Sequence, residues 1–72
     1  MYLAVSEENS RKNTAYGLAQ VVNRTKVGDS FAFSFDVARV LRISIAGLTA
    51  PERTAIQNAC DIRFGPGKVV VS

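Results

Sequence analysis

Few residues in this 72-residue sequence could carry out chemistry. There is no histidine, the side chain that most often transfers protons near neutral pH, and Cys60 is the single cysteine. Cys60 falls on the apolar side of an expected helix, so we interpret it as structural rather than nucleophilic. One cysteine and scattered acids also lack the donor set of a zinc site. We therefore expect no enzyme, no metal, no cofactor and no small-molecule substrate.

The segment "FGPGK" near the C-terminus is rich in glycine. A phosphate-binding loop needs G-x-x-x-x-G-K followed by serine or threonine, between a strand and a helix, and this segment lacks that pattern. Here we expect the glycines to lie between two strands. The segment is then either a plain turn or an exposed hairpin tip that presents Arg63 and Lys68.

Phe31, Phe33 and Phe35 alternate with small residues, which predicts a strand with all three rings on one face. Exposed rings on a strand can stack against the bases of single-stranded nucleic acid. A short chain without tryptophan needs its large rings inside, however. We therefore expect these rings, together with Phe64, to form much of the core.

The charges are unevenly distributed along a chain of net charge +3. Glu7 and Glu8 precede a stretch, residues 11–26, that contains bases and no acid. Such a surface permits binding to nucleic acid or to an acidic protein but requires neither, and an ordinary solvated surface is the alternative. The expected partner-binding residues are Arg11, Lys12, Arg24, Lys26, Arg39 and Arg42.

Length and composition indicate one domain over residues 1–72, with residues 1–10 as a flexible arm. An apolar share of 47% suffices for a core. A lone cysteine favours a reducing compartment, and no apolar run approaches the ~20 residues of a membrane span. The start "MYLAVSEENS" does not have the pattern of a signal peptide. We therefore expect a cytoplasmic protein that does not enter a membrane.

Periodicity predicts an α+β fold: two or three short helices packed on a small antiparallel sheet, with a C-terminal β-hairpin. Residues 2–5 could form a short strand. A helix should begin between residues 9 and 14, bury an apolar face that includes Ala15 and Ala19, and end near Lys26 or Gly28. Residues 37–48 fit either a helix or a strand, and we expect a helix capped by Asp36.

Thr49 and Glu52 form a capping-box pattern that predicts a helix over residues 49–60. Residues 61–64 then read as a strand and residues 65–67 as a turn. The final strand, "KVVVS", is expected to pair with residues 61–64 or with residues 2–5, and to cover the phenylalanines.

The order helix, strand, helix, helix, hairpin resembles a winged helix. The resemblance implies a helix-turn-helix over residues 37–60 and a wing over residues 61–72. Arg53 and Gln57 would then read bases, while Arg63 and Lys68 would contact the backbone of double-stranded DNA. The segment "RISIAGLTAPERT" lacks the small residue and glycine at the usual spacing of that motif.

The segments "KVGDSFAF" and "DIRFGPGKVVVS" resemble small phage-encoded regulators, some of which bind the host RNA polymerase. This resemblance implies a non-catalytic transcription regulator, an inhibitor or modulator that docks its basic face on bacterial RNA polymerase in the host cytoplasm. The alternatives are direct binding of double-stranded DNA and a small structural or assembly subunit.

Overall fold

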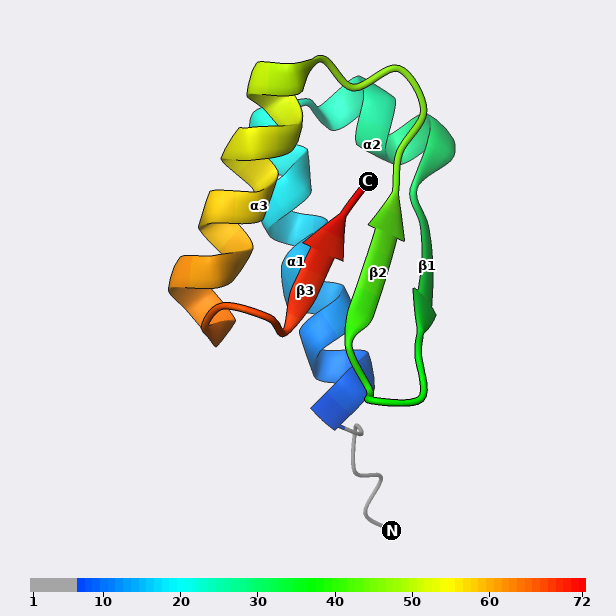
Figure 1. Ribbon diagram of the computed structural model, residues 1–72. Helices are drawn as coiled ribbons and strands as arrows, with labels where there is room; N and C mark the ends of the chain where they lie inside the picture. The colour runs from blue at the N-terminus through cyan, green and yellow to red at the C-terminus, as the bar shows by residue number, and fades with distance from the viewer. Residues whose placement is uncertain (1–6) are drawn as a thin grey trace, which may run out of the picture.

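The computed structural model describes residues 7–72, which fold into a helical layer and a sheet (Figure 1). The sheet lies in front of the first helix, and the third helix runs alongside it. In chain order the elements are α1 (Glu7–Val22), α2 (Arg24–Ser30), β1 (Ala32–Phe35), β2 (Leu41–Ser44), α3 (Ala50–Phe64) and β3 (Val69–Val71).

The sheet is mixed, with the strand order β1-β2-β3. β1 pairs antiparallel to β2, whereas β3 pairs parallel to β2 with Leu41 opposite Val69 and Ile43 opposite Val71. Parallel neighbours need a crossover connection, and α3 provides it. The predicted α+β class is therefore confirmed, but the sheet is not purely antiparallel.

The core is aliphatic and lies between the helices and one face of the sheet. Leu41 and Ile43 on β2 and Val69 on β3 are at most 1% exposed, while the alternate residues of these strands face solvent. This alternation is expected of a sheet covered on one face. The remaining buried residues are Ala15, Ala19, Val27, Ile45, Ile56, Cys60 and Val71.

The expectation that phenylalanines form much of the core is wrong. Phe31, Phe35 and Phe64 are only partly buried against the core, and Phe33 is 45% exposed. Phe33 and Phe35 share the helix side of the sheet with their partners Ile43 and Leu41. They lie on an edge strand, however, and the helices cover mainly the other two strands.

Residues 37–48 do not form the expected helix, because Leu41–Ser44 is strand β2. Asp36 still acts as a cap, but of a turn. Its Oδ1 accepts hydrogen bonds from the N–H groups of Ala38 (2.8 Å) and Val40 (3.0 Å). Aspartate caps turns and helix N-termini by the same bonds, so its presence alone does not distinguish them.

The C-terminal segment also differs from the expected hairpin. Residues 61–64 continue α3 instead of forming a strand, and the helix ends where the Gly65 N–H donates to the Asp61 carbonyl at 2.8 Å. Gly65 adopts a φ of 97°, which favours glycine and stops the helix. The final strand therefore pairs with β2, and not with residues 61–64.

The first expected helix is divided at Asn23. The Asn23 side chain caps α2 by accepting a hydrogen bond from the Lys26 N–H at 3.0 Å. α1 begins at Glu7, so residues 7–10 are helical and do not belong to an arm. The expected strand at residues 2–5 and the rest of the arm lie outside the described residues.

A carboxylate joins α2 to the start of α3. The capping box of Thr49 and Glu52 is present as expected. Glu52 also accepts hydrogen bonds from the Lys26 Nζ (2.8 Å) and the Asn23 Nδ2 (2.7 Å). These bonds, the one from Lys26 foremost, lower the pKa of Glu52 to about 2.

Burial on α3 predicts a sharp contrast between two isoleucines. Ile56→Ala removes a fully buried side chain and should lower the free energy of unfolding by about 2–5 kcal/mol. Ile62→Ala, on the same helix but 87% exposed, should change it by less than about 0.5 kcal/mol. Urea denaturation of both variants measures this, and equal losses would contradict the described core.

The Glu52 contacts predict acid sensitivity. Because the folded pKa lies below the ordinary value of 4.5, Glu52 stabilises the fold above pH 4.5, and this contribution disappears as pH falls towards 2. Glu52→Gln should flatten the loss of stability between these pH values. Thermal melts at several pH values test this, and an unchanged pH profile in the variant would refute the role of Glu52.

Candidate partner-binding surface

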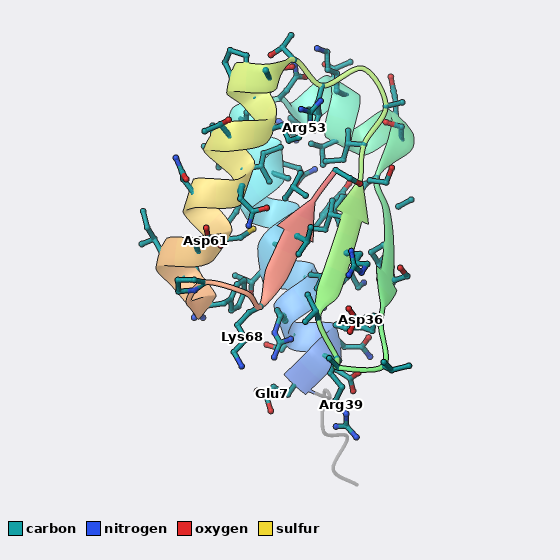
Figure 2. The ribbon with its side chains drawn as sticks, in the orientation of Figure 1. Glu7, Asp36, Arg39, Arg53, Asp61 and Lys68 are labelled. Atoms are coloured by element: carbon teal, nitrogen blue, oxygen red, sulfur yellow. The ribbon has the colours of Figure 1, made fainter. Side chains whose placement is uncertain are left out.

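The parallel pairing brings the beginnings of β2 and β3 to the same end of the sheet. The Leu41 N–H donates to the Lys68 carbonyl at 3.0 Å, so the turn before β2 lies beside the loop before β3. The first turns of α1 reach the same end. Figure 2 shows Glu7, Arg39 and Lys68 gathered there, far from Arg53.

Four cations lie at this end of the molecule, which we call the basic end: Arg11, Arg39, Arg63 and Lys68. Two adjoining shallow hollows connect them. Arg11, Arg63 and Lys68 line the first hollow with Phe64. Arg39 lines the second hollow with Arg11 and Lys68, so the two hollows share Arg11 and Lys68.

The four cations differ in their contacts and in their exposure. The Arg11 Nη1 donates to the Arg39 carbonyl at 2.9 Å, and its side chain is only 14% exposed, so Arg11 chiefly fastens the β1–β2 turn to α1. Arg63 lies over the Phe64 ring at 5.2 Å. Arg39 and Lys68 are exposed, and neither forms an ion pair with any described residue.

Two acids accompany the basic end. Glu7 lines both hollows and Glu8 lines the second. The ion pair between Glu7 and Arg11 spans 3.7 Å, with Glu7 90% exposed, so it is a weak contact. The four cations therefore outnumber the two acids, and the lining of the two hollows taken together has an excess of positive charge.

The six basic residues expected to form one surface are spread over the molecule. Only Arg11 and Arg39 belong to the basic end. Lys26 is paired with Glu52 and Arg42 with Asp36 at 3.3 Å, while Lys12 lies over the Phe33 ring at 5.2 Å. Arg24 is exposed at the start of α2, near the opposite end of the molecule (Figure 1).

Gln57 is not free to read a base. Its Nε2 donates to the Val69 carbonyl at 2.7 Å and to Asp61 at 2.9 Å, and its Oε1 accepts from the Val71 N–H at 2.9 Å. The Gln57 side chain thus forms hydrogen bonds with outward-facing backbone groups of β3, as the backbone of a further strand would. Arg53, by contrast, is exposed on α3.

The winged-helix arrangement is also not formed. Residues 37–60 contain one strand and one helix instead of two helices, and residues 61–72 contain the end of α3 and one strand. Neither a helix-turn-helix nor a two-stranded wing is present in this part of the chain.

Cys60 is fully buried, and this burial raises the pKa of its thiol to about 11. The thiol is therefore protonated at neutral pH and out of reach of a substrate. Residues 7–72 contain no group of three or more metal-ligating side chains. Within the same residues, no helix is both long enough and apolar enough to cross a membrane.

The sequence did not predict that Lys68 would line one hollow with Arg63 and a second hollow with Arg39. Arg63 and Lys68 were expected together on a hairpin, and Arg39 on a helix face. Only the parallel register unites them, and short-range patterns do not specify that register. Comparison with protein-family models, with curated proteins and with solved structures finds no match to this chain.

The backbone at Arg39 predicts a stabilising substitution. Arg39 has a φ of 62°, a left-handed conformation that costs a non-glycine residue about 1–2 kcal/mol. Arg39→Gly should raise the free energy of unfolding by up to about 1 kcal/mol, because glycine's greater unfolded entropy offsets part of the relief. Ala38→Gly, a neighbour at ordinary φ, should instead lower stability. Chemical denaturation of both variants is the measurement, and destabilisation by both would count against this backbone geometry.

Proposed function

We propose that this protein is a non-catalytic transcription regulator that docks its basic end on an acidic surface of bacterial RNA polymerase in the cytoplasm. The observation that supports the proposal is that Lys68 lines two adjoining shallow hollows, one of them together with Arg63 and the other together with Arg39. Complementary charge on a partner would orient the encounter and accelerate association. The choice of polymerase follows the resemblance of the sequence to phage-encoded regulators.

The geometry favours an acidic protein over duplex DNA. Glu7 lines both hollows and Glu8 lines the second, and acids beside a phosphate backbone would oppose binding. A protein partner can place its own bases opposite these acids. The two residues expected to read bases are not part of the basic end. Gln57 forms hydrogen bonds with β3, and Arg53 lies near the start of α3, far from the basic end.

Purified bacterial RNA polymerase provides the direct test. The unmodified chain should bind the immobilised enzyme at moderate salt. Arg39→Glu combined with Lys68→Glu should weaken binding by about tenfold or more, because two attractive contacts become repulsive. Arg24→Glu combined with Arg53→Glu is the matched control: it makes the same change in net charge away from the basic end, and it should alter the affinity by less than about twofold.

Absence of binding to the polymerase, or equal weakening by both pairs of substitutions, would refute the proposal. A titration with a short DNA duplex separates the alternative. Contact of three free cations with phosphates predicts a slope near −3 in a plot of log affinity against log salt, from about −0.9 per contact. Tighter binding to the duplex than to the polymerase, with such a slope, would replace this proposal by direct DNA binding.

A further inference from the structure

The two outer edges of the sheet differ in the hydrogen bonding of their backbone groups. The outer edge of β3 is filled by the amide of Gln57. The outer edge of β1 receives no hydrogen bond from the other described residues. Exposed edge strands are usually protected by a charge, a proline or a bulge, and the β1 sequence, AFSF, contains none of these.

The hydrogen bonds at the β1–β2 turn identify the unpaired groups. The Asp36 N–H donates to the Val40 carbonyl at 3.2 Å, so that pair is a hydrogen-bonded one. In an antiparallel ladder such pairs alternate, which makes Ser34 and Ala32 the residues bonded to β2. The N–H and C=O groups of Phe33 and Phe35 therefore point outward.

Bonds on the other side of β2 agree with this assignment. The Leu41 N–H donates to Lys68, and the Ile43 carbonyl accepts from the Ser72 N–H at 2.9 Å. These two residues, opposite Phe35 and Phe33, thus use their backbone groups towards β3 and not towards β1.

The outward edge is complementary to itself. The sequence Phe33-Ser34-Phe35 reads the same in both directions, so two copies can pair antiparallel with Ser34 opposite Ser34. Phe33 of each copy then lies opposite Phe35 of the other, and each such pair exchanges two backbone hydrogen bonds. Directly opposed aromatic residues are a favourable cross-strand pair.

A largely aromatic hollow lies beside Phe33. It is lined by Lys12, Asn13, Tyr16, Phe31 and Phe33. Its rings already contact one another: the centroids of Tyr16 and Phe31 are 4.8 Å apart, and those of Phe31 and Phe33 are 6.2 Å apart. Phe35 of a second copy would lie on this same side of the sheet and extend the aromatic row.

We propose that the protein forms a two-fold symmetric dimer in which the β1 strands of two copies pair antiparallel about Ser34. The six strands then form one continuous sheet. Because Gln57 closes the far edge in each copy, assembly stops at two. The symmetry axis is perpendicular to the sheet, so the dimer presents two basic ends pointing in opposite directions. This inference does not depend on the proposed function.

A cysteine cross-link tests the register. Ser34→Cys places two sulfurs at a non-hydrogen-bonded pair, whose Cβ atoms lie about 4.5–5.5 Å apart and close to disulfide distance. Ala32→Cys is the matched control on the same exposed face of β1. In the proposed register its two copies lie four residues apart along the strands, about 14 Å at 3.4 Å per residue. Cys60 is buried and does not compete.

Under mild oxidation, Ser34→Cys should form a covalent dimer at least about tenfold faster than Ala32→Cys. Equal rates for the two variants, or no cross-link in either, would overturn the register. Circular dichroism of both reduced variants confirms that each is folded before oxidation.

Sedimentation equilibrium of the unmodified chain tests the dimer without a cross-link. The mass should rise from 7.8 kDa towards twice that value as concentration increases to about 1 mM. Ser34→Lys opposes two ammonium groups at the axis and should remain monomeric, whereas Ser44→Lys, on the neighbouring strand, should still dimerise. An unmodified chain that stays monomeric throughout would overturn the proposal and leave the β1 edge to a strand from another protein.

Discussion

The parallel pairing of β2 with β3 determines both the sheet side of the core and the neighbours at one end of the molecule. It aligns Leu41 with Val69 and Ile43 with Val71, which gives the core its sheet side. It also requires the crossover through α3, which places Ile56 and Cys60 over those strands. The same alignment starts both strands at one end of the molecule, so the residues just before them become neighbours. A basic end made from distant parts of the sequence is a consequence of this register.

Polar side-chain contacts differ between the two ends of the molecule. At one end, Glu52 connects Asn23, Lys26 and Thr49, and so joins α2 to the start of α3. At the other end, Arg11 fastens a turn while Arg39 and Lys68 remain without an ion-pair partner among residues 7–72. Gln57 forms hydrogen bonds along the outer edge of β3, whereas the outer edge of β1 receives no backbone hydrogen bond from another residue within 7–72.

Local sequence patterns correctly predicted the features that depend on residues close together in the sequence. The capping box of Thr49 and Glu52, the buried Cys60 and the strand at residues 32–35 were foreseen and are present. Residues 37–48 and 61–64 were assigned wrongly, because Asp36 caps turns as well as helices and "DIRF" fits a helix as well as a strand. Phe33 was expected in the core, but its exposure depends on its strand being at an edge. The basic end depends on strand order, which no short pattern specifies.

We propose that the end built by the parallel pair is where this protein contacts its partner, and hydrogen–deuterium exchange of the 72-residue chain with and without RNA polymerase is the decisive measurement. Polymerase should slow exchange in residues 36–40 and 65–68 together, and leave residues 23–30 and 49–53 unchanged. Protection confined to residues 23–30 and 49–53, or no protection at saturating polymerase, would contradict it.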